Sequence, residues 1–303
     1  MSDANTAVWS AAVRRSRPFD APLKTEHGIM TDLISGTEAR AVSGRASVRA
    51  FLGISALLFA ASAAVTIVCC QSMSTMGEMP MPGGWTMSMA WMRMCGQTWF
   101  DAAASFLGMW VVTMVAMMLP SLVPMLWRYR QAVAGTGERR LGTLTAVAGG
   151  GYVFVWAVVG LAAFAVGATL AAITMQLPAL SRAVPMAAGV VVLLAGAFQF
   201  TVWKAHHLAC CRQAPAQGRM LPAEARTAWD HGLRLGLHCV YSCAGLMAIL
   251  LVIGVMDLAV MVLVTAAITA ERLLPGGARA ARAIGAIAVG AGLFLIARAA
   301  GLG

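Results

Sequence analysis

The feature that most limits the fold of this chain is its series of long apolar runs. The chain has 303 residues, of which 60% are hydrophobic and only 11% charged, whereas a soluble domain carries about a quarter charged residues. Runs of about 18 or more apolar residues are typical of helices that cross a bilayer. The sequence therefore predicts an all-α, polytopic transmembrane helical bundle. We expect about seven spans, at residues 48–70, 101–127, 144–174, 186–207, 233–254, 256–271 and 281–298.

The first 47 residues differ from the rest, because they are polar, mixed in charge and without apolar periodicity. This pattern predicts a disordered cytoplasmic tail at 1–47 and a transmembrane helical domain at 48–303. The sixth apolar run is short for a span, so a tilted, re-entrant or partly buried helix is an alternative there.

The net charge of +10 follows the expected topology instead of forming one basic patch. Basic residues gather before the first span and in the second, fourth and sixth connections, which is the positive-inside pattern with the N-terminus in the cytoplasm. An odd number of spans then places the C-terminus outside. The scattered charges argue against nucleic acid as a partner and leave the lipid bilayer.

The residues with the most specific chemistry lie between Lys204 and Met247. This stretch holds four of the five histidines and four of the seven cysteines. Several of them stand four apart, which on a helix places both side chains on one face. The candidate metal ligands are His206, His207, Cys210, Cys211, His238, Cys239 and Cys243.

Two helices side by side could present four of these ligands, His207, Cys211, Cys239 and Cys243, to one ion. Thiolate and imidazole groups suit Cu(I) or Zn(II). If the fifth span starts near Arg234, however, Cys243 lies about 13 Å deeper along that helix. The sequence leaves open whether the pairs form one site, two sites or a transfer path. Cysteines that only pack as small apolar side chains are a further alternative.

A methionine-rich segment between the first two spans is a candidate for outer metal capture. Thioethers are soft ligands that favour Cu(I), although methionines also coat surfaces and fill irregular gaps. Proline, glycine and serine among them predict a loop. The candidates are Met73, Met76, Met79, Met81, Met87, Met89, Met92, Met94 and Cys95.

Inside the second span, Met114, Met117 and Met118 precede Pro120. Proline frees a backbone carbonyl about four residues earlier, so stacked thioethers beside a kink could relay a soft ion. Packing of a kinked helix is the equal alternative. Two acidic residues, Asp101 and Asp257, are expected to cap helices near the membrane surface.

Four blocks of the sequence resemble a bacterial family of predicted metal-binding integral membrane proteins. The residues that fit are Trp110, Met114, Met117, Met118, Leu119, Pro120, Ser121 and Pro124, then Lys204, Leu208, Cys211 and Arg212, then Cys239, Cys243, Leu246 and Met247, and finally Glu271, Arg272 and Pro275. His207 stands where the family has a cysteine, and Tyr241, Ser242 and Ala244 also depart from its pattern. The resemblance implies a multi-pass protein of the bacterial cytoplasmic membrane with a metal site, and no particular activity.

Together these patterns predict a membrane protein that binds a soft transition metal, with copper favoured and zinc as the alternative, in metal handling or transport. The rival from another class is a membrane thiol oxidoreductase that uses Cys239 and Cys243, although their spacing is not the redox Cys-x-x-Cys spacing. A third interpretation is an accessory subunit that docks on another membrane protein and holds a structural metal. No Walker motif, Rossmann glycine pattern or Ser-His-Asp arrangement is present, which argues against ATP-driven pumping and hydrolysis by this chain alone and otherwise leaves enzyme activity open.

Overall fold

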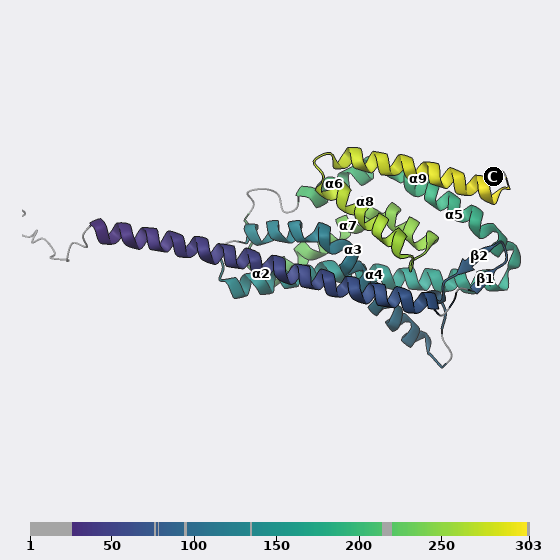
Figure 1. Cartoon of the computed structure of the whole chain (residues 1–303), viewed down its shortest axis with the longest axis horizontal. Coiled ribbons are helices and arrows are strands. Elements are labelled where there is room, and N and C mark those ends of the chain that lie inside the picture. The colour runs from purple at the N-terminus through teal and green to yellow at the C-terminus, as the bar shows by residue number, and fades with distance from the viewer. Residues whose placement is uncertain are drawn as a thin grey trace, which may run out of the picture. The chain divides into compact units, whose positions relative to one another are not determined.

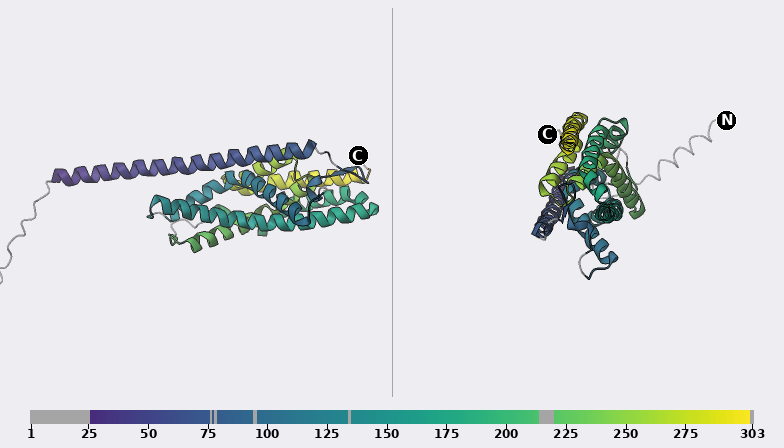
Figure 2. Two further views of the ribbon diagram at one scale, coloured as in Figure 1. Left: turned by 90° about the horizontal axis from the view of Figure 1, so that it is seen from below. Right: turned by 90° about the vertical axis from the view of Figure 1, so that its right-hand side faces the viewer.

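The computed structural model describes residues 26–75, 77, 79–93, 96–133, 135–213 and 220–301, with side chains from residue 46 onward. The chain forms two units, Met1–Ala50 and Phe51–Gly303. The second unit is a helical bundle whose long helices have roughly aligned axes and alternate in chain direction (Figures 1 and 2). The elements are α2 (Glu26–Thr75), β1 (Met79–Met81), β2 (Trp85–Met87), η2 (Met89–Trp91), α3 (Trp99–Ala132), α4 (Glu138–Gln176), α5 (Pro178–Phe198), α6 (Val202–Gln213), α7 (Ala225–Ile253), α8 (Leu258–Leu273) and α9 (Gly277–Ala299). The predicted all-α helical bundle is confirmed.

In the described part of the chain, six helices are long and apolar enough to cross a membrane, which indicates a lipid environment. They comprise Ala46–Thr75 of α2 together with α3, α4, α5, α7 and α9. The expected span at 256–271 corresponds to α8, which has only 16 residues. At 1.5 Å per residue such a helix is about 24 Å long, short of the hydrocarbon core.

The tail predicted at 1–47 is described only in part. Residues 1–25 lie outside the described residues, and from Glu26 onward the structure has the first turns of α2 where the sequence predicts irregular chain.

Acidic residues begin two helices, as predicted from Asp101 and Asp257. The Thr98 hydroxyl accepts from the backbone N–H of Asp101, and the Asp101 carboxylate accepts from the backbone N–H of Thr98, which is a capping box at the start of α3. Asp257 Oδ1 accepts from the backbone N–H groups of Ala259 and Val260 at the start of α8. Both carboxylates thus compensate unpaired backbone donors of a helix end.

Small residues let two pairs of helices approach closely. Where α4 packs on α7, a Cβ atom added to Gly232 would lie 2.1 Å from the Ala148 carbonyl oxygen. Where α5 packs on α9, one added to Gly196 would lie 2.6 Å from the Val289 backbone nitrogen. Contacts this short exclude any side chain, as expected where membrane helices associate through glycine.

The methionine-rich segment contains a short antiparallel hairpin in which Met79 pairs with Met87. Its turn passes through Gly83 and Gly84, both with positive φ, a conformation that glycine adopts without steric cost. The Trp85 indole donates to the Ser181 carbonyl at 2.9 Å, so the hairpin is fixed to the start of α5. The sequence predicts only a loop in this region.

Candidate metal centre

The histidine- and cysteine-bearing segment forms a helix of its own, α6, whereas the sequence predicts that it continues the span at 186–207. The span α5 ends earlier because the backbone N–H groups of Gln199, Phe200 and Thr201 each bond to the carbonyl three residues back. The Thr201 hydroxyl then accepts from the backbone N–H of Lys204 at 3.3 Å. Threonine is a favoured N-cap residue, so this turn starts α6 in a new direction.

A buried ion pair fixes α6 to α8. Lys204 Nζ lies 2.8 Å from both carboxylate oxygens of Glu271, and the two side chains are 1% and 2% exposed. Burial lowers the pKa of Lys204, and the Glu271 carboxylate opposes that shift. Arg212, at the end of α6, also donates to the backbone carbonyls of Glu271 and Leu274, at 3.1 and 2.7 Å.

Four buried sulfur-bearing side chains, Met118, Cys211, Cys239 and Cys243, gather beside this pair and are called the sulfur cluster here. They come from α3, α6 and α7, and none is more than 1% exposed. Cys239 Sγ lies 4.0 Å from Met118 Sδ. Cys243 is one turn further along the same face of α7. The described cysteines of this cluster are free thiols.

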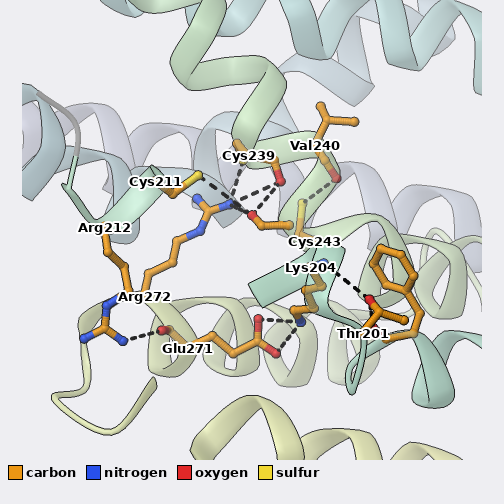
Figure 3. Close-up of polar contacts among 11 residues, drawn as sticks. Thr201, Lys204, Cys211, Arg212, Cys239, Val240, Cys243, Glu271 and Arg272 are labelled. Carbon is orange, nitrogen blue, oxygen red and sulfur yellow. Dashed lines mark hydrogen bonds and ion pairs between the residues drawn. The ribbon is translucent and has the colours of Figure 1, made fainter. Parts of the chain in front are cut away.

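Polar side chains surround Cys239 and connect it to Cys211 (Figure 3). Arg272 Nη2 donates to Cys239 Sγ at 2.9 Å and to Ser242 Oγ at 3.2 Å. Ser242 Oγ in turn lies 3.9 Å from Cys211 Sγ. On the other side of Cys239, the Tyr152 hydroxyl shares a hydrogen bond of 2.9 Å with its sulfur.

The Cys211 thiol is fully buried at the end of α6. Burial raises its pKa to about 11, against the opposing effect of the Arg272 charge. The sulfur therefore carries its proton at neutral pH, and a metal that bound there would displace that proton.

The histidines lie apart from the sulfur cluster. His207 Nδ1 is 2.9 Å from His238 Nδ1, and the His207 ring packs on Trp203 and Tyr241, with centroid separations of 4.5 and 4.9 Å. His206 Nε2 is 3.7 Å from Cys210 Sγ.

The predicted ligands thus divide between the sulfur cluster and a second set, called the histidine group here, which consists of His206, His207, His238 and Cys210. Within the described ranges no three or more His, Cys, Asp or Glu side chains are arranged to hold a metal ion. The single site of His207, Cys211, Cys239 and Cys243 is therefore not confirmed.

The sulfur cluster nevertheless has donors of the type that copper requires. Two sulfur ligands that share one metal, each about 2.3 Å from it, lie about 4 Å apart, which is the separation of Met118 Sδ and Cys239 Sγ. Thiol and thioether ligands select Cu(I). Met114 and Met117 are also buried, at 3% exposure each, and lie within two turns of Met118 on α3.

The methionines of the hairpin segment fall into two groups. Met81 and Met87 are buried against Ala171, as the packing interpretation predicts. Met73, Met79, Met89 and Met92 are half-buried. Met76, Met94 and Cys95 lie outside the described residues.

Sequence reasoning did not select Tyr152 or Ser242, and it did not place Arg272 against a sulfur atom. A tyrosine within an apolar span is a signal that could have found the first. Glu271 and Arg272 were selected through the family resemblance, which gives no partner for either. The partners are separated by 67 residues for Lys204 and Glu271 and by 33 for Cys239 and Arg272, and such pairs follow only from the fold.

Comparison with known proteins connects this chain to copper handling. Searches of curated proteins and of solved structures find no match to the chain. Residues 107–295 match the family PpoB2, described as copper chaperone. The matched segment contains the sulfur cluster, the histidine group and the Lys204–Glu271 ion pair. Because it covers more than half of the chain, the protein belongs to the PpoB2 copper chaperone family.

Proposed function

We propose that this protein is an integral membrane copper chaperone that holds Cu(I) at the sulfur cluster. The observation that carries the proposal is the contact between Cys239 and Met118, in which a thiol and a thioether with no solvent exposure lie 4.0 Å apart. Cys243 and Cys211 are the neighbouring thiols that complete the coordination after side-chain rotation. Soft donors in a dry site favour Cu(I) over Zn(II).

Arg272 supports this assignment electrostatically. Cu(I) held by two thiolates forms a group with net negative charge, and burial of such a group is costly unless a positive charge compensates it. The guanidinium that donates to Cys239 supplies that charge. Ser121 Oγ accepts from its other nitrogen at 3.1 Å and fixes the side chain in this position.

The histidine group forms a second, separate step of the proposed route. His207 and His238 face each other at the α6 end of the bundle, with His206 and Cys210 beside them. Imidazole binds copper more weakly than a thiolate set does, which suits transfer to a recipient protein. We propose that Met114, Met117 and Met118 bring the ion along α3 to the cluster.

The basic residues of the sequence support an N-terminus in the cytoplasm, and we propose a bacterial cytoplasmic membrane as the location. Arg212 at the end of α6 donates to the Leu274 carbonyl, so α8 returns the chain to the α6 end. From there α9 runs back along α5 until Ile296 packs on Gly189, which places the C-terminus on the outer side. This arrangement puts α6 and the histidine group at the cytoplasmic surface.

The test is Cu(I) affinity, measured by competition with a chelator under reducing conditions, on the full-length protein in lipid nanodiscs. Substitution of one ligand lowers metal affinity by at least about 10–100-fold, so Cys239→Ser and Met118→Leu are expected to fall by that factor. Met125→Leu, a change at a buried residue of the same helix, and Cys70→Ser are the matched controls and should bind as the wild type does.

Two results would contradict the proposal. One is Cys239→Ser protein that binds Cu(I) with wild-type affinity. The other is protein that retains Zn(II) in preference to Cu(I) at equal free concentrations. Formation of a reversible Cys239–Cys243 disulfide during turnover, detected by thiol alkylation, would instead favour the oxidoreductase.

A further inference from the structure

We propose a second Cu(I) site in a cavity between α2, η2 and α3, separate from the sulfur cluster. The proposal rests on the copper-handling function for the identity of its metal. The cavity has a volume of about 290 Å³, and its lining includes five sulfur-bearing residues from three segments of the chain. They belong to Cys69, Met73, Met89, Met92 and Met109.

The fold brings these sulfurs together from positions far apart in the sequence. Cys69 and Met73 are four residues apart on α2 and share a face. Met109 projects from α3. Met89 opens η2, which is fixed to α3 because the Trp91 ring packs on the Phe106 ring with a centroid separation of 5.2 Å. The methionines of η2 and of the residue after it are therefore held beside the cavity and are not free in solvent.

The chemistry of the lining selects the ion. Among the described residues that line the cavity, none has a carboxylate, imidazole, ammonium or guanidinium group, and the polar side chains are those of serine and glutamine. Hard divalent cations require charged oxygen ligands, whereas neutral thioethers with one thiol suit a soft monovalent ion. Cys69 is a free, half-buried thiol that a bound ion can reach.

Two methionines of the same segment do not line the cavity, although Met92 lies between the two sets and also packs against them. Met81 and Met87 face Ala171 and pack without lining the cavity. A run of methionines that only filled space would not be expected to converge on an open cavity in this way. The distinction also supplies a matched pair of control positions.

The cavity lies at the start of a path to the sulfur cluster. Met109 lines the cavity, and Met114, Met117 and Met118 follow on the same helix. Nine residues of helix separate Met109 from Met118, a rise of about 14 Å. The cavity is thus a loading site from which the ion moves along α3. Most of its ligands precede residue 107, where the family match begins, so the site is additional to what that match covers.

The experiment counts bound Ag(I), a redox-inert analogue of Cu(I), on full-length protein in nanodiscs. Met73→Leu/Met109→Leu keeps side-chain volume nearly constant and is expected to weaken one class of bound Ag(I) at least about tenfold. Met81→Leu/Met87→Leu should keep both classes. Cys239→Ser should lose the other class and retain the one at the cavity.

A second measurement needs no substitution. Ag(I) is expected to protect Cys69 of the otherwise wild-type protein from maleimide labelling. Unchanged Ag(I) binding by Met73→Leu/Met109→Leu, or unchanged labelling of Cys69, would overturn the cavity site. Loss of Ag(I) binding in Cys239→Ser alone would then support the sulfur cluster without the cavity site. Loss of Ag(I) binding in Met73→Leu/Met109→Leu alone would support the cavity site without the sulfur cluster.

Discussion

Glu271→Gln is expected to lower the free energy of unfolding by about 3–5 kcal/mol, because it leaves the buried Lys204 ammonium without a counter-charge. The two groups are bonded at 2.8 Å and have almost no contact with solvent, so water cannot replace the lost carboxylate. Denaturation of the full-length protein in detergent, followed by the fluorescence of its tryptophans, measures the change.

The matched control is Glu138→Gln, in which the affected carboxylate lies 3.7 Å from Arg130 and is 56% exposed. Arg130 is itself only 8% exposed, but water reaches the Glu138 side of the pair, so this variant is expected to lose less stability than Glu271→Gln. Removal of both charges in Lys204→Met/Glu271→Leu is expected to recover most of the stability, since no buried charge remains. Equal stability of Glu271→Gln and the control would contradict the importance of this pair.

Gly232→Ala is expected to have the second largest effect, on both stability and copper binding. The new methyl group would lie 2.1 Å from the Ala148 carbonyl oxygen, and a backbone atom cannot rotate away. The helices α4 and α7 must therefore separate, at a cost of about 1–3 kcal/mol or more. Their separation would also pull Tyr152, on α4, from Cys239, on α7, which are joined at 2.9 Å.

Gly149→Ala is the appropriate comparison, because a Cβ atom at Gly149 meets open space on the same helix pair. Alanine favours a helix by about 1 kcal/mol over glycine, so this variant should be as stable as the wild type or more stable. Unfolding and Cu(I) competition measured on both variants test the prediction. Wild-type Cu(I) affinity in Gly232→Ala would show that the α4–α7 contact does not position the cluster.

Much of the fold could be predicted because long apolar runs in the sequence identify membrane-spanning helices. The capping role of Asp101 and Asp257 also followed from residue type. The break between α5 and α6 could not be predicted, because Val202 and Trp203 continue the apolar run. The turn there depends on the Thr201 cap. The apolar run of α8 is visibly short for a span, but hydropathy alone could not decide between a tilted, a re-entrant and a partly buried helix.

The sequence identified the residue types of the candidate site, but it did not show which of these residues lie together. A spacing of four places His207 and Cys211 on one face of α6, yet one lies against His238 and the other against Ser242. Which partner each meets depends on how α6 turns away from α5. The contact of Arg272 with Cys239 required the packing of two helices that no local pattern relates.

Glu271 and Arg272 are successive residues of α8 that serve two different neighbours. One carboxylate anchors α6 through Lys204, and the adjacent guanidinium contacts the thiol of Cys239 on α7. A rotation of this short helix therefore moves both contacts together. Any movement of Arg272 that accompanies arrival of the ion is transmitted along one peptide unit to the anchor of α6, so occupancy of the cluster and the position of the histidine group are mechanically linked.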